Sequence, residues 1–143
     1  MIKTSLLCFF VSLFAVAGAQ GKVVVHISNF RNNNGSCLVA IYDNAGAFTG
    51  KGSPVKYLCA AITGHQAEAT IENLPAGTYA ISVIHDANNN KRFDTNFIGI
   101  PTEGYGASRN KLPFAAAPKF DANKFSIDGN ASMSVNIRLR YLL

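Results

Sequence analysis

The feature that most constrains the fold of this chain is an alternation of apolar and polar side chains with a period of two residues. It is clearest near the C-terminus, where Met133, Val135, Ile137, Leu139 and Tyr141 alternate with serine, asparagine and arginine. A β-strand turns successive side chains to opposite faces, so this pattern predicts a strand with one buried and one solvated face. The same alternation recurs in residues 23–28, 37–42, 55–61, 67–72 and 79–84.

Short runs rich in Asn, Gly and Pro separate these segments, at residues 32–35, 43–46, 63–64 and 74–77. Such residues favour tight turns, because Asn and Gly tolerate positive φ and Pro fixes its own φ. Short alternating strands joined in this way are typical of sandwiches and barrels. We therefore predict an all-β fold, an antiparallel β-sandwich of about seven strands. Further short strands are predicted near residues 96–100 and 124–127, and a single helical turn near 44–49.

The first nineteen residues have the layout of a secretory signal peptide. Lys3 supplies a positive start, residues 6–16 are apolar apart from Ser12, and small residues follow at 17–19. We predict cleavage after Ala19, which leaves one domain at residues 20–143, in the periplasm or outside the cell, with no transmembrane span. A retained anchor helix is the alternative, but the apolar run is shorter than the ~20 residues that a membrane helix needs.

Cysteine content and charge narrow the choice of partners. The mature chain keeps Cys37 and Cys59, and in an exported protein this pair predicts one disulfide, with two buried free thiols as the alternative. Two cysteines without a spaced histidine pair make only half a zinc site. The net charge is +5 and loses one unit with Lys3, but the basic residues form no cluster. Nucleic acid is therefore not an expected partner.

Oxygen-bearing side chains stand at alternate positions in one polar segment, namely Asp86, Asn88, Asn90 and Asp94, and Arg92 can add its backbone carbonyl. Calcium takes 6–8 oxygens from carboxylates, amides and main-chain carbonyls. The first half of the segment is similar to the start of an EF-hand loop, which makes calcium binding one of two interpretations of this segment. The alternative is a hairpin in which the Asp and Asn side chains cap their own backbone.

Two positions depart from the EF-hand pattern. Lys91 stands where a glycine is expected, and Phe97 stands where a bidentate glutamate is expected. Glu103, in the following loop, is the residue that can add a third carboxylate. Asp86, Asp94 and Glu103 also support an alternative function, a small hydrolase or a metal-handling protein, if a cleft brings them together.

His85 directly precedes Asp86. Because alternation turns adjacent side chains to opposite faces, the two cannot easily form a catalytic dyad, and we expect His85 to be a hydrogen-bonded residue at the rim of the core. The next loop carries Glu103, Tyr105 and Arg109 among glycines. Flexible backbone and aromatic side chains suit contact with a ligand or partner. The alternative is that the aromatic side chains pack over one end of the sandwich.

The stretch at residues 69–94 reads ATIENLPAGTYAISVIHDANNNKRFD, and TNFIGIPTEGYGASRN follows it. These letters contain L-P-x-G-x-Y at residues 74–79, H-D-x-N-x-N at 85–90 and G-x-P-x-E-x-Y-G at 99–106. The combination resembles DUF2141, an exported bacterial family of unknown function, and the resemblance extends roughly over residues 23–139. It implies a transthyretin-like or immunoglobulin-like β-sandwich and export, but no established activity.

The sequence thus predicts a secreted or periplasmic, non-catalytic module with a binding or structural role in the cell envelope, stabilised by calcium. Expected partners are an envelope protein, which an edge strand could engage by β-augmentation, or a glycan.

Overall fold

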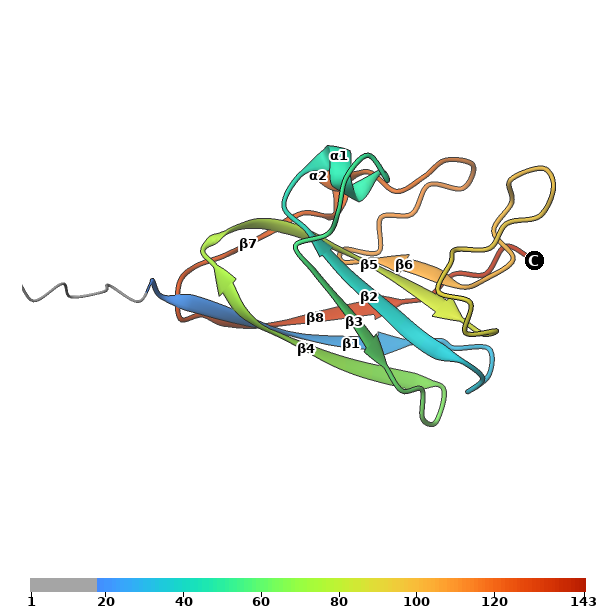
Figure 1. Ribbon diagram of the computed structural model, residues 1–143, viewed down its shortest axis with the longest axis horizontal. Coiled ribbons are helices and arrows are strands. Elements are labelled where there is room, and N and C mark those ends of the chain that lie inside the picture. The colour runs from blue at the N-terminus through green and yellow to red at the C-terminus, as the bar shows by residue number, and fades with distance from the viewer. Residues whose placement is uncertain (1–17) are drawn as a thin grey trace, which may run out of the picture.

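The computed structural model describes residues 18–143, in which two β-sheets pack face to face (Figure 1). Its strands are β1 (Gln20–Ser28), β2 (Ser36–Tyr42), β3 (Lys56–Ala60), β4 (Gln66–Pro75), β5 (Gly77–Asp86), β6 (Tyr105–Ala107), β7 (Phe125–Ile127) and β8 (Ser132–Arg138). Two one-turn helices, α1 (Ala45–Phe48) and α2 (Phe120–Asn123), complete the set. The signal peptide predicted at residues 1–19 lies almost wholly outside the described residues, and within those residues no helix is long and apolar enough to cross a membrane.

One sheet has the strand order β4-β1-β8 and the other β3-β2-β5-β6, with β7 paired to the start of β5. A bend at Ala76 separates β4 from β5 and carries the chain from one sheet to the other. These two sheets confirm the predicted all-β sandwich. The pairs are antiparallel except β1 with β8, which run parallel from Lys22 opposite Ser132 to Ser28 opposite Arg138. No short hairpin joins β1 to β8, so turn geometry does not impose an antiparallel pairing on them.

The core lies between the sheets and is formed by the inward positions of the alternating segments. Its fully buried members come from both sheets and include Val23, Val25, Ile27, Val39, Ile41, Ile71, Ile81, Val83 and Ile137. Burying one such side chain stabilises the fold by about 1.5–3 kcal/mol relative to leaving it in water. The period-two pattern therefore identified the faces that hold the sheets together.

The helical turn predicted at residues 44–49 is present as α1, and Asn44 caps it by accepting a hydrogen bond from the Ala47 N–H at 2.9 Å. The short strand predicted near 124–127 is present as β7. The strand predicted at 96–100 is wrong, because Asn96 folds this segment into a tight turn. The sequence analysis missed β6 and α2, which are three and four residues long and show no alternation of their own.

The predicted disulfide is absent, and both cysteines are free thiols. In the register of β2 and β3, Cys37 lies opposite Ala60, while Cys59 lies opposite Leu38. This offset of one residue turns the two side chains to opposite faces of the sheet. Cys37 is buried in the core, where desolvation raises its pKa to about 12, whereas Cys59 is exposed.

We expect a thiol-alkylating reagent to modify Cys59 in the folded protein and Cys37 only after unfolding, because the thiolate is the reactive form and Cys37 is both buried and held protonated. Mass spectrometry of the native and the denatured protein would show one and two adducts. If the native protein had no reactive thiol and two thiols became reactive after reduction, the cysteines would be joined in a disulfide, which would contradict the structure.

Candidate metal centre

Asp86 ends β5 and anchors the polar loop that follows it. Its side chain is fully buried, with Oδ1 accepting the Asn90 N–H at 3.0 Å and Oδ2 accepting the Lys91 N–H at 2.8 Å. The pairing of β5 with β2 fixes its backbone opposite Ser36. Gly35 passes so close that a Cβ there would lie 1.9 Å from the Asp86 carbonyl oxygen, at a φ of +69° that already favours glycine.

The asparagines of the loop order the backbone beyond Asp86. Asn88 Oδ1 accepts the Asn90 N–H at 3.1 Å, and Asn90 Oδ1 accepts the Arg92 N–H at 2.9 Å. The Nδ2 groups of both asparagines donate to the same oxygen, Oδ2 of Asp94, at 2.8 and 2.7 Å. The amide Nδ2 groups of Asn88 and Asn90 therefore meet at Asp94, while the side-chain oxygens of Asp86, Asn88 and Asn90 accept backbone N–H groups. These contacts are those of the hairpin alternative, in which Asp and Asn side chains cap their own backbone, and calcium binding stays a prediction.

Lys91 adopts the backbone conformation that its place in the pattern requires. Its φ is +59°, in the left-handed region that the expected glycine would supply without strain. Asn89 is left-handed as well, with a φ of +57°. The loop therefore keeps its turn although Lys91 replaces the glycine of the EF-hand pattern, and the cost is a strained backbone at Lys91.

Replacing Lys91 with glycine is expected to stabilise the protein by about 1 kcal/mol, because a non-glycine residue costs about 1–2 kcal/mol in this region while glycine loses some chain entropy on folding. Chemical denaturation would measure the change, and Lys91→Val would be the matched opposite, with a lower stability. A glycine variant less stable than wild type would show that the loop does not need this conformation.

Glu103 faces the loop from the segment before β6. Its side chain is only 7% exposed, and Oε2 accepts the Asp94 N–H at 3.0 Å. Within the described residues, Oε1 is buried and has no hydrogen-bond partner. Burial raises the pKa of the Glu103 carboxyl, and the charges of Asp94 and Asp86 raise it further, while the backbone N–H groups of Asp94 and Ala87 lower it. The His85 N–H holds the neighbouring Gly104 carbonyl at 2.8 Å and so fixes this segment beside Asp86.

The donors of this site differ in kind. Asp94 accepts hydrogen bonds from the side-chain amides of Asn88 and Asn90, and its backbone N–H donates to Glu103, while Asp86 ends β5 where the same loop begins. Within residues 18–143, no three His, Cys, Asp or Glu side chains are already drawn together at the spacing of a metal centre. An oxygen-only set that mixes carboxylates with amides suits a hard cation such as calcium rather than zinc.

The structure separates the other residues predicted for a ligand loop. Phe97, at the position of the missing glutamate, points away and is 99% exposed. Tyr105 is buried on β6 and stacks edge-to-face on Phe93, with the ring centres 5.7 Å apart. Arg109 is exposed, and its backbone N–H donates to Asn123. Glu103, Tyr105 and Arg109 therefore do not form one site, and only Glu103 joins the polar loop.

His85 is a buried member of a hydrogen-bonded cluster, as expected. Its Nδ1 lies 2.8 Å from the Tyr141 hydroxyl and its Nε2 lies 2.8 Å from the Asn34 carbonyl oxygen. Phe30 packs edge-to-face against its ring at 5.1 Å. Both ring nitrogens are therefore occupied, and the Asp86 carboxylate is bonded to its own loop.

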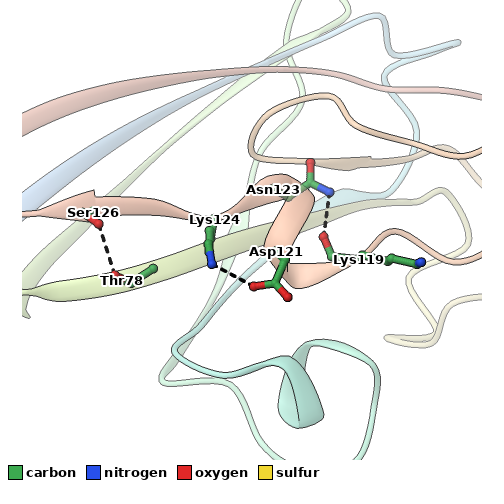
Figure 2. Close-up of polar contacts among 6 residues, drawn as sticks. All are labelled: Thr78, Lys119, Asp121, Asn123, Lys124 and Ser126. Atoms are coloured by element: carbon green, nitrogen blue, oxygen red, sulfur yellow. Dashed lines mark hydrogen bonds and ion pairs between the residues drawn. The ribbon is translucent and has the colours of Figure 1, made fainter.

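Asn123, which the sequence did not single out, holds the second loop of this end of the sandwich. It is fully buried at the end of α2, and its Nδ2 donates to the carbonyls of Lys119 and Lys111, each at 3.0 Å (Figure 2 shows the bond to Lys119). Its Oδ1 accepts the N–H groups of Lys111 and Arg109 at 3.1 and 3.3 Å. One buried amide thus fixes both ends of residues 111–119.

A groove of about 650 Å³ lies beside the polar loop. Its apolar lining includes Phe93, Ile98, Pro101, Tyr105, Phe114 and Leu142. None of the three carboxylates of the candidate metal centre lines this groove. The carboxylates and the apolar groove are therefore separate features of the same end of the sandwich.

Comparison with known proteins identifies the family but gives no activity. No curated protein matches the chain. A leucine-rich repeat protein from Bacteroides thetaiotaomicron VPI-5482 aligns with a TM-score of 0.37 and 14% identity, over 85% of this chain and 12% of its own length. The family described as "Uncharacterized protein conserved in bacteria (DUF2141)" matches residues 25–136. These residues run from within β1 to within β8 and contain the whole candidate metal centre, and the chain belongs to the DUF2141 family.

Proposed function

We propose that this protein is an exported, non-catalytic β-sandwich module of the bacterial cell envelope, and that the loop from Asp86 to Asp94 binds calcium together with Glu103. The observation that carries the calcium site is the buried, unpartnered Oε1 of Glu103 beside two further carboxylates. A buried carboxylate oxygen without a donor is costly unless a cation or a proton meets it.

Calcium would add a further link between parts of the chain that hydrogen bonds already join. Asp86 belongs to the end of β5, Asp94 closes the loop, and Glu103 leads into β6. A cation shared by these residues removes the repulsion among their charges and fixes the loop on the sheet. A binding or structural role follows from this arrangement, because calcium would then set the shape of one end of the sandwich.

The hydrolase alternative has less support from the same residues. Both oxygens of Asp86 accept backbone N–H groups, and Oδ2 of Asp94 accepts two amide groups. A pair of catalytic carboxylates needs a cleft in which substrate reaches both, and the 650 Å³ groove is lined by other residues. Carboxylates held by the backbone suit cation binding better than proton transfer.

Isothermal titration calorimetry with calcium chloride tests the proposal. The mature protein is expected to bind one calcium ion, with magnesium binding much more weakly because it prefers smaller, octahedral sites. Glu103→Gln is expected to weaken binding at least tenfold. Asp121→Asn is the control, since Asp121 is exposed and pairs only with Lys124 at 2.8 Å (Figure 2).

Equal calcium affinity in wild type and Glu103→Gln, or no binding at millimolar calcium, would refute the calcium site. Hydrolytic turnover that is lost in Asp94→Ala would instead favour the enzyme.

A further inference from the structure

Two loops, at residues 91–101 and 111–119, lie at the same end of the sandwich (Figure 1). Each presents large apolar side chains to solvent. Phe97 is 99% exposed and Ile98 65% exposed at the tip of one, and Phe114 is 85% exposed on the other. Both loops line the groove of about 650 Å³, which the C-terminal Leu142 and Leu143 complete. Ile98 and Phe114 line this groove, and Phe97 precedes Ile98 in the same turn. Exposed apolar side chains gathered in this way mark an interaction site.

Hydrogen bonds hold the first tip in place. Asn96 Oδ1 accepts the N–H groups of Ile98 and Ile100 at 3.1 and 2.9 Å, and the Asn96 N–H donates to the Ile100 carbonyl at 2.8 Å. Gly99 completes the turn with a φ of +82°. The turn therefore fixes Phe97 and Ile98 in an outward position rather than leaving them to pack on the sandwich.

The second tip is fixed from two sides. Asn123 bonds the backbone at Lys111 and Lys119, and the Arg140 guanidinium donates to the Leu112 carbonyl at 2.6 Å. Phe114 lies between these anchors and contributes its ring to the groove rather than to the core. Two separately built loops thus carry apolar tips on one groove.

The exposed charges that flank these tips are mostly positive, and Asp121, two residues beyond Lys119, pairs with Lys124 at 2.8 Å. Lys91 and Arg92 come directly before the first loop, and Lys111 and Lys119 bracket the second. The acidic side chains between residues 91 and 119 are Asp94 and Glu103, which belong to the candidate metal centre and are half-buried and buried. A partner with apolar and negatively charged parts would complement this surface.

We propose that this end of the sandwich docks on an anionic lipid bilayer, with Phe97, Ile98 and Phe114 inserted among the acyl chains and the flanking basic residues against the headgroups. Aromatic side chains are favoured at the membrane interface, and basic residues near an anionic surface add to the attraction. A second copy of the chain fits less well, because two like-charged surfaces would repel. The inference stands without the calcium site.

Sedimentation with vesicles tests it, using vesicles of phosphatidylcholine alone and an equimolar mixture with phosphatidylglycerol. Wild-type mature protein is expected to bind the mixed vesicles roughly tenfold better. The double variant Phe97→Ser with Phe114→Ser is expected to lose binding by roughly tenfold or more, since each phenyl ring would otherwise leave water. Its Tm should not change, because both side chains lie in solvent.

Tyr57→Ser is the matched control, since Tyr57 is 51% exposed on β3 and does not line the groove. Lys111→Gln with Lys119→Gln should weaken binding to mixed vesicles and leave any binding to phosphatidylcholine unchanged. Wild type that ignores both vesicles, or a double variant that binds like wild type, would overturn the proposal. Concentration-dependent dimers that the double variant abolishes, without vesicle binding, would assign the surface to self-association instead.

Each measurement is made with calcium and with a chelator. Vesicle binding that persists in chelator would support the lipid surface as independent of calcium. Binding by calcium-loaded protein that Glu103→Gln abolishes, while Phe97→Ser with Phe114→Ser leaves it intact, would contradict insertion of the tips but keep the metal site.

Discussion

Millimolar calcium is expected to raise the Tm of the mature protein by about 10 °C. A ligand present at 100 times its dissociation constant stabilises the folded state by about 2.7 kcal/mol, and a domain of this size gains roughly 4 °C per kcal/mol. Differential scanning calorimetry with calcium and then with excess chelator would measure the shift and its reversal. An Asp86→Asn variant keeps the shape of the side chain but loses a charge, and its shift should be much smaller.

The variant Glu103→Gln tests whether the stabilisation by calcium depends on the charge of Glu103. The pKa of Glu103 is raised in the folded state, chiefly by burial. Its contribution to stability is therefore present below the unfolded pKa and is lost as the pH rises through the raised folded value. At neutral pH and without calcium, Glu103→Gln should be at least as stable as wild type, whereas with calcium wild type should be the more stable. If the same protein were the more stable both with and without calcium, Glu103 would have a structural role and would not bind the ion.

Replacing Asn123 with alanine is expected to lower the free energy of unfolding by about 3 kcal/mol and the Tm by roughly 10 °C. The change removes four hydrogen bonds from a fully buried amide. The N–H groups of Arg109 and Lys111 and the carbonyls of Lys111 and Lys119 lose a partner. Chemical denaturation would measure the loss.

Asp121→Ala, on the exposed side of the same helical turn, is the control and should change stability by no more than about 0.5 kcal/mol. Equal stability of the Asn123 and Asp121 variants would show that Asn123 does not hold the loop at residues 111–119.

The sequence was most informative where one physical rule decided the structure. Alternation located six of the eight strands in the described residues, since burying one face of a sheet leaves little choice of register. The Asp and Asn residues at 86–94 cap their own backbone, as the hairpin alternative predicted, because each closes a local turn on its neighbours. These contacts span few residues, and propensity and spacing describe them well.

Contacts between segments that lie far apart in the chain could not be predicted from the sequence. The prediction of a disulfide was wrong because the register of β2 and β3 is offset by one residue from the one that would pair Cys37 with Cys59. The offset turns the two side chains to opposite faces of the sheet. Asn123 gave no signal, since its partners are brought to it by the packing of α2 against the loop at residues 108–111. Glu103 was a candidate, but only the structure shows its buried oxygen beside Asp94.

The central claim, that calcium binds between the Asp86–Asp94 loop and Glu103, is tested most directly by nuclear magnetic resonance of ¹⁵N-labelled mature protein during a calcium titration. The backbone amides of residues 86–94 and 103, together with the side-chain amides of Asn88 and Asn90, should shift and saturate together. Val25 and Ile137 in the distant core should stay unchanged. Shifts confined to amides beside exposed carboxylates elsewhere, or none in residues 86–103 at millimolar calcium, would contradict the account.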